Sequence, residues 1–174
     1  MRGLLLIEMN KFQDERGTFQ ELYNAKKYED LLPKHTHFVQ DNFSRSKKNV
    51  FRGLHFQSPP MAQGKLVQVL EGKALDLVVD IRKDSNTFGE SFTVELSETN
   101  NLQLYVPRGF AHGFYSLSEN TLFHYKCDNY YSREHEQTLK WDDKKWELDI
   151  DNRALIISEK DLKGVAFADF VSPF

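Results

Sequence analysis

A series of short, strand-forming segments between residues 65 and 127 constrains the fold of this chain more than any other feature. Turn-forming residues separate these segments at intervals of mostly about 8 to 12 residues, which is typical of an all-β sandwich or barrel. Aromatic residues, Val and Thr are frequent in them and favour strands over helices. The sequence predicts strands at residues 50–57, 65–70, 74–81, 91–96, 102–106, 113–117 and 121–127.

The segment at 74–81 shows a clear alternation of period two. Its odd positions carry Leu, Val and Ile, whereas Asp76 and Asp80 share the opposite face with Ala74 and Val78. One face of this strand therefore carries carboxylates.

Turn and helix signals divide the rest of the chain. Glu71-Gly72 predicts a tight hairpin between the segments on either side of it. We also expect a loop at 84–89, a turn at 107–109, and short helical segments at 27–32, 133–137 and 159–162. The sequence contains no internal repeat and no linker, so a single domain over residues 1–174 is expected.

Charge and composition exclude several classes of protein. The net charge of −3 does not suit a nucleic-acid-binding protein that relies on a large positive field. The apolar runs are too short to span a membrane, and the N-terminus has no signal-peptide pattern, so a cytoplasmic protein without a membrane partner is expected. Cys127 is the only cysteine, which excludes internal disulfides and a multi-cysteine zinc site.

A cluster of nitrogen-bearing side chains occurs between residues 52 and 65. Strand alternation places Arg52 and His55 on opposite faces of one strand, and Lys65 follows closely. Two interpretations are open from these residues alone. His55 can be a core histidine with Lys65 an exposed edge residue, or the cluster can be part of an active site.

Eight segments, in order and in register from about residue 5 to residue 165, carry a family resemblance. They are residues 14–21, 40–44, 52–57 (Arg-Gly-Leu-His-Phe-Gln), 63–67, 76–82, 107–114, 125–131 and 158–161. Together they resemble the dTDP-4-dehydrorhamnose 3,5-epimerase family of deoxysugar biosynthesis, which serves dTDP-rhamnose and cell-surface polysaccharide formation. The resemblance implies a cupin-type jelly roll, an all-β sandwich or barrel with short peripheral helices, and a homodimer that exchanges N-terminal strands.

The resemblance also implies a cofactor-free epimerisation of a nucleotide-linked 4-keto-6-deoxy sugar. A proton beside a ketone is removed by a base while a cation stabilises the enolate, and an acid then returns a proton to the opposite face. By similarity, His55 is the base, Asp161 its partner, Lys65 the enolate stabiliser and Tyr125 the acid.

Further positions match the family's substrate-binding residues. Arg52 is expected to bind the diphosphate, and Arg16 to do so from the partner subunit. Asp76 is expected to support Lys65 or His55. The complete expected substrate-binding set is Arg16, Phe19, Glu21, Gln40, Asn42, Arg52, Gln57, Asp76, His112 and Tyr131.

Several alternatives stay open at this stage. A metal is not expected, because the His35-Thr36-His37 motif lacks the Glu that metal-binding cupins place after it. The related possibilities are an epimerase that inverts only C3 or C5 of a dTDP- or GDP-linked hexose or heptose, a nucleotide-sugar ketoisomerase, and a non-enzymatic sugar-nucleotide binding module. A binding module would be expected to lose one of the four catalytic residues, and this chain keeps them all. Residues 146–151 lack the family's usual proline, so the loop expected at the pocket mouth can differ and alter sugar selection.

Overall fold

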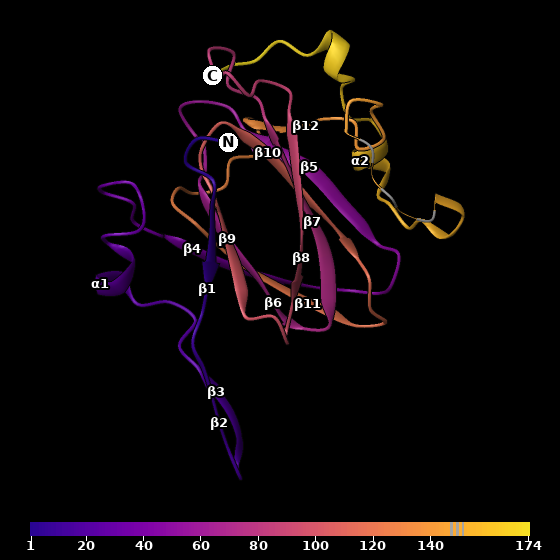
Figure 1. The fold of residues 1–174 in the computed structure, drawn as a ribbon. Helices are drawn as coiled ribbons and strands as arrows, with labels where there is room; N and C mark the ends of the chain where they lie inside the picture. Colours follow the sequence, from indigo (N-terminus) through magenta and orange to yellow (C-terminus); the bar gives the residue numbers. More distant parts are fainter. Residues whose placement is uncertain (147, 149, 151) are drawn as a thin grey trace.

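The computed structural model describes residues 1–146, 148, 150 and 152–174, and these residues confirm the all-β prediction. They form two five-stranded antiparallel sheets, with strand orders β1-β9-β6-β11-β4 and β12-β5-β10-β7-β8. The two sheets face each other (Figure 1). The strands of these two sheets are β1 (Leu5–Glu8), β4 (Gln40–Ser46), β5 (Phe51–Gln57), β6 (Lys65–Glu71), β7 (Lys73–Asp80), β8 (Ser91–Ser97), β9 (Leu102–Val106), β10 (Phe110–Ser116), β11 (Thr121–Cys127) and β12 (Glu136–Thr138).

Most predicted elements form close to their expected bounds. The strands expected at 102–106 and 121–127 and the helix at 159–162, α2 (Glu159–Leu162), are confirmed at those positions. The strand expected from 113 begins earlier, at Phe110, directly after the predicted turn. The first helix, α1 (Ala25–Tyr28), also begins earlier than expected because the side chain of Asn24 accepts a hydrogen bond from the Lys26 N–H and caps it.

The helix predicted at 133–137 is wrong. Residues 133–135 form a turn, and β12 follows it as an edge strand that pairs with β5 through Glu136 opposite Gln57 and Thr138 opposite His55. Three residues are too few to carry a periodic signal, and the partner strand lies about 80 positions earlier in the chain. Tertiary pairing therefore decides this segment.

The hairpin predicted at Glu71-Gly72 is also wrong. The chain does turn there, but β6 joins one sheet and β7 the other, so the two strands are not paired. Gly72 has a φ of +76°, and a Cβ atom there would lie 2.1 Å from the carbonyl oxygen of Asn120. Gly72 therefore lies at a corner where the chain passes from one sheet to the other. The local sequence does not show that the strands on either side of it belong to different sheets.

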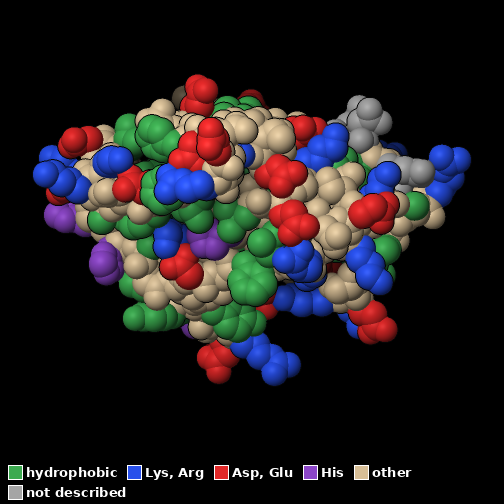
Figure 2. Space-filling model, turned by 90° about the horizontal axis from the view of Figure 1, so that it is seen from below, with side chains coloured by type: hydrophobic (Ala, Val, Ile, Leu, Met, Phe, Trp, Pro, Cys, Tyr) green, Lys and Arg blue, Asp and Glu red, His purple; other side chains and the backbone are tan. Residues whose placement is uncertain are grey.

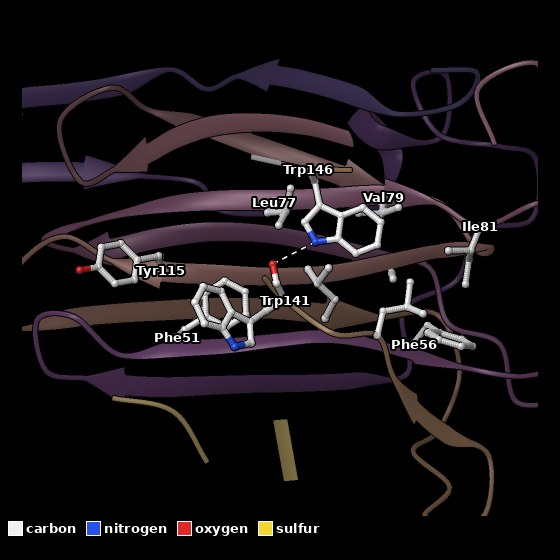
Figure 3. Close-up of a cluster of buried hydrophobic side chains, with 11 residues drawn as sticks. Phe51, Phe56, Leu77, Val79, Ile81, Tyr115, Trp141 and Trp146 are labelled. Carbon is white, nitrogen blue, oxygen red and sulfur yellow. Dashed lines mark hydrogen bonds between the residues drawn. The ribbon is translucent and has the colours of Figure 1, made fainter. Parts of the chain in front are cut away.

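The two faces of β7 pack against different cores. Leu77 and Val79 join Trp141 and Trp146 in a cluster between β5, β10, β7 and the C-terminal segment (Figure 3). Val78 faces the space between the two sheets instead, in a second cluster. The predicted carboxylate face is confirmed, because Asp76 and Asp80 are both fully buried on this second face.

An N-terminal hairpin projects from the body of the molecule. It consists of β2 (Lys11–Asp14) and β3 (Gly17–Gln20), which pair only with each other among the described residues (Figure 1). Phe12 and Phe19 on this hairpin are 62% and 70% exposed. Figure 2, viewed from the side toward which the hairpin points, shows acidic and basic side chains intermixed around exposed apolar ones.

No helix in the described part of the chain is long and apolar enough to cross a membrane.

We predict that Trp146→Ala destabilises the protein by about 3–5 kcal/mol, because the buried indole and its hydrogen bond to the Trp141 carbonyl are both lost. Urea unfolding followed by circular dichroism measures the change. Val171→Ala, at a position that is 87% exposed, is the control and should stay within about 0.5 kcal/mol of the unmodified protein. Equal effects of the two substitutions would contradict this account of the core.

Candidate active site

A cavity of about 610 Å³ opens between the two sheets. Its volume falls in the range of about 300–1,000 Å³ that is usual for small-molecule sites. Phe114 and Phe123, whose rings stack in parallel 4.1 Å apart, give it an apolar wall. Its polar lining residues are Ser44, Arg52, His55, Lys65, His112, Tyr125, Glu136, Ser158, Lys160 and Asp161. All four residues predicted to be catalytic therefore line one cavity.

His55 and Asp161 form a close pair within this cavity. The distance from His55 Nε2 to Asp161 Oδ1 is 2.6 Å, and because an ionised carboxylate can only accept, the imidazole N–H donates. Helix α2 supplies Asp161 in its first turn, where the Ser158 hydroxyl accepts from the Asp161 N–H. Burial raises the pKa of Asp161, but the bond and charge of His55, with the Gly53 N–H and Ser158, hold that pKa below its ordinary value.

Strand β5 brings Arg52 and His55 to the same cavity, so the prediction that they lie on opposite faces is wrong. The pairing with β10 shifts register between His55 and Arg52, which breaks the alternation of side chains. Gly53, between them, has a φ of +138°, and a Cβ atom there would lie 2.5 Å from the Cα atom of Gly113. Arg52 Nε also donates to Ser46 Oγ over 3.1 Å, which holds the guanidinium in place.

Lys65 on β6 and Tyr125 on β11 are half-buried and line the same cavity. Burial lowers the pKa of Lys65, and the nearby acidic groups Cys127, Asp76 and Glu136 oppose that change. Burial raises the pKa of Tyr125. The phenol therefore stays protonated at neutral pH and can donate a proton. A protonated Lys65 would attract a negative oxygen in the cavity, because water screens charge poorly there.

A second histidine–carboxylate pair lies beside the first. His112 lines the cavity, and its Nε2 is 2.9 Å from Oδ2 of the fully buried Asp76. The other oxygen of Asp76 has no hydrogen-bond partner among the described residues. Asp76 itself does not line the cavity, and it contacts His112, whereas the sequence placed it beside Lys65 or His55. Among the described residues, Asp76 acts on Lys65 through its charge.

Other expected substrate-binding residues hold the segment that follows β11. The backbone N–H of Tyr131 donates to Gln40 over 3.1 Å, and the backbone N–H of Ser132 donates to Gln57 over 2.7 Å. Gln40 in turn donates to Asn42 over 3.0 Å. The structure thus groups these residues with Tyr131 but does not place them in the cavity lining.

The remaining expected residues, Arg16, Phe19 and Glu21, lie outside the cavity of their own chain. Arg16 is at the tip of the projecting hairpin, where it pairs with Asp14. Glu21 forms an ion pair with Lys27, 2.6 Å away.

The sequence did not identify four of the polar lining residues, which are Ser44, Glu136, Ser158 and Lys160. Glu136 falls in the segment wrongly predicted to be helical, so nothing indicated its position. Lys160 directly precedes Asp161 within a segment that resembles the family. This adjacency could have indicated that Lys160 lies near the cavity. The loop expected to differ at 146–151 includes residues 147, 149 and 151, which lie outside the described residues. Among the described residues, no three His, Cys, Asp or Glu side chains are grouped so that they could hold a metal ion.

A jelly-roll barrel whose cavity holds an imidazole–carboxylate pair, an ammonium and a phenol defines a class of acid–base enzymes built on the cupin-type fold. A profile of the dTDP-4-dehydrorhamnose 3,5-epimerase family matches residues 1–169, and the chain belongs to this family. The match confirms the resemblance drawn from the sequence, and with it an isomerase.

Individual relatives cover nearly the whole chain. The dTDP-4-dehydrorhamnose 3,5-epimerase of Shigella flexneri is 45% identical over 166 residues, which are 95% of this chain and 92% of that protein. The crystal structure of the enzyme of that name from Elizabethkingia anophelis NUHP1 is 49% identical, with a TM-score of 0.90 over 97% of this chain and 93% of that one. The epimerase of Legionella pneumophila Philadelphia 1, solved in complex with dTDP-4-keto-L-rhamnose, is 46% identical, with a TM-score of 0.91 over 95% and 88%.

We predict that Cys127 reacts slowly with thiol reagents in the folded protein. It is 1% exposed, and burial raises its pKa to about 11, although the Lys65 ammonium limits the rise. At pH 8 the reactive thiolate should be on the order of 100-fold scarcer than for an ordinary cysteine. Iodoacetamide labelling followed by mass spectrometry, with and without urea, measures the difference. Equal rates in the two conditions would contradict the burial described here.

Proposed function

We propose that this protein catalyses the cofactor-independent 3,5-epimerisation of a nucleotide-linked 4-keto-6-deoxy sugar, converting dTDP-4-dehydro-6-deoxy-D-glucose to dTDP-4-dehydro-L-rhamnose. The observation that carries the proposal is the His55–Asp161 pair in one cavity with Lys65 and Tyr125. Membership of the epimerase family supports the choice of substrate. The whole chain acts as one domain in this proposal, in the cytoplasm.

The first step is removal of the proton next to the C4 ketone by His55. Because Nε2 donates to Asp161, the base is Nδ1, the other ring nitrogen. The carbon–hydrogen bond breaks, its proton moves to the imidazole, and its electron pair forms the enolate with negative charge on the C4 oxygen. Asp161 stabilises the resulting imidazolium, and Lys65 stabilises the enolate oxygen.

The second step is return of a proton to the opposite face of the same carbon. Tyr125 is the donor, since the raised pKa of its phenol keeps the proton available at neutral pH. The enolate electrons form the new carbon–hydrogen bond, and the ketone is restored. The phenolate left on Tyr125 faces the positive charge of Arg52, and exchange of protons with solvent resets both residues. Repeating these two steps at the other of the two carbons, C3 and C5, gives the doubly inverted sugar.

Binding of the nucleotide completes the proposal. Arg52 binds the diphosphate with the part of its guanidinium that Ser46 leaves free. His112 contacts the sugar from the cavity wall, and Tyr131 lies near the nucleotide with the residues that hold it, Gln40, Asn42 and Gln57. Asp76 orients the His112 ring through the hydrogen bond between them.

The projecting hairpin supports a homodimer in which each subunit completes the site of the other. Phe12 and Phe19 are largely exposed on it, and burial of such side chains against a second copy would be favourable. In this arrangement Arg16, Phe19 and Glu21 of one subunit contribute to binding in its partner's cavity.

We predict that His55→Ala abolishes both epimerisation and incorporation of solvent deuterium next to the ketone, because no base remains. Tyr125→Phe should suppress inversion but keep part of the exchange, because proton abstraction precedes reprotonation. NMR of dTDP-4-keto-6-deoxyglucose incubated with each protein in heavy water locates the label at C3 and C5.

The same experiment separates the alternatives. Label at a single carbon would indicate a single-centre epimerase, and no exchange with the unmodified protein would indicate a binding module. Full activity of His55→Ala would remove His55 from the mechanism. Tyr28→Phe is a control, because that phenol is buried against Gln103, outside the cavity lining.

For the dimer, we predict that mixing inactive subunits restores activity. Arg16→Ala and His55→Ala proteins, unfolded together and refolded, should form hybrids in which one site has both its own His55 and the partner's intact arm. Turnover at low substrate concentration should then exceed that of either variant alone. If the refolded mixture has a dimeric mass but no gain in turnover over the separate variants, Arg16 does not act across subunits.

A further inference from the structure

Two charged residues of the cavity wall, Glu136 and Lys160, have no role in the mechanism proposed above. Lys160 Nζ forms an ion pair with Oε1 of Glu136. The other oxygen of Glu136 accepts a hydrogen bond from the Tyr131 hydroxyl over 2.9 Å. Both members of the ion pair line the cavity, together with His55 and Asp161.

The ion pair connects the two elements that carry the base and its partner. Glu136 begins β12, and this strand is paired with β5 so that Thr138 lies opposite His55. Lys160 belongs to α2 and directly precedes Asp161. The ion pair therefore joins α2 to the β5–β12 ladder next to the point where Asp161 reaches His55.

The two charges differ in their exposure. The side chain of Glu136 is 17% exposed, whereas that of Lys160 is 51% exposed. A half-exposed ion pair contributes little to the overall stability of a protein. A carboxylate inside a cavity, by contrast, acts strongly on neighbouring charges, because water screens it poorly.

The carboxylate of Glu136 acts on two residues that have roles in the proposed mechanism, Tyr125 and Lys65. Its charge raises the pKa of Tyr125 and opposes the lowering of the pKa of Lys65. Burial raises the pKa of Glu136, but Lys160, Tyr131 and the charge of His55 outweigh it and hold that pKa below its ordinary value. Glu136 is thus ionised at neutral pH and competes with Asp161 for the positive charge of His55.

We propose that Lys160 is a positioning residue for the reaction: its ion pair with Glu136 fixes Asp161 against His55. It also neutralises Glu136, so that among the carboxylates of the described residues Asp161 alone governs the base. This inference rests on the proposed function. It adds a requirement that the four catalytic residues do not include, namely that the charge of a further carboxylate, Glu136, be cancelled within the same cavity.

The groups that face the ion pair come from several elements, and all of them can influence a pH profile. Tyr131, in the segment before β12, contacts Glu136 directly. The other titratable or charged residues line the same cavity: Arg52 and His55 on β5, Lys65 on β6, His112 on β10, Tyr125 on β11 and Asp161 on α2. Among side chains with unperturbed pKa values, only histidine changes its charge between pH 5 and 8.

The test is the pH dependence of solvent deuterium exchange and of epimerisation for Lys160→Met. Exchange should fall by up to about 100-fold, since Asp161 loses its alignment with the base. The acidic limb should also move to higher pH, because an uncompensated Glu136 stabilises the imidazolium and the free base then forms only at higher pH. Lys160→Arg should restore both quantities, because it keeps the ion pair.

The double variant Glu136→Gln/Lys160→Met separates charge from structure. It lacks the uncompensated carboxylate, so its acidic limb should return to the position of the unmodified protein even though its rate stays low. Lys163→Met, which removes a charge just after the same helix and outside the cavity lining, should change neither rate nor limb. Thermal unfolding of each variant checks that it is folded.

The outcomes distinguish this inference from the function on which it rests. No exchange by the unmodified protein would overturn both. An active unmodified protein with Lys160→Met indistinguishable from it would overturn only the role of Lys160. A folded Lys160→Met protein whose rate falls while the acidic limb of its pH profile stays in place would also overturn it. So would a double variant whose acidic limb moves as far as that of Lys160→Met. A merely structural contact would have these effects.

Discussion

The bond between His55 and Asp161 is the interaction on which the site depends. It joins residues 106 positions apart, one on a central strand and one in a short helix near the C-terminus. The C-terminal segment can deliver Asp161 only because its tryptophans pack on the face of β5, β10 and β7 that points away from the cavity. Apolar burial on one side of the sheet thus fixes a polar contact on the other.

Inside the barrel, charge is tolerated because nearly every group has a partner. Asp161 pairs with His55, Asp76 with His112, and Glu136 with Lys160, so burial of each carboxylate is offset. Lys65 differs, because among the described residues the acidic groups near it act on it through their charge. An ammonium left available in this way is suited to a negative oxygen that forms only during a reaction.

Local sequence signals predicted the strands well, because alternation and turn residues act over a few positions. They failed where distant segments decided the outcome. Gly72 was correctly placed in a turn, but only the two sheets determine that it is a corner. The shift of register around Gly53, which turns Arg52 and His55 toward one cavity, depends on close contact with Gly113 of another strand.

By itself, the sequence determined an all-β fold, the carboxylate face of β7 and, through family-like segments, which residues to expect in the site. Only the tertiary structure decided how they combine: that Asp76 pairs with His112, that Glu136 reaches the cavity from a strand of three residues, and that it forms an ion pair with Lys160. The reason is that periodicity reports which way a side chain faces within its own element. Partners, burial and electric field are set by packing between elements that lie far apart in the chain.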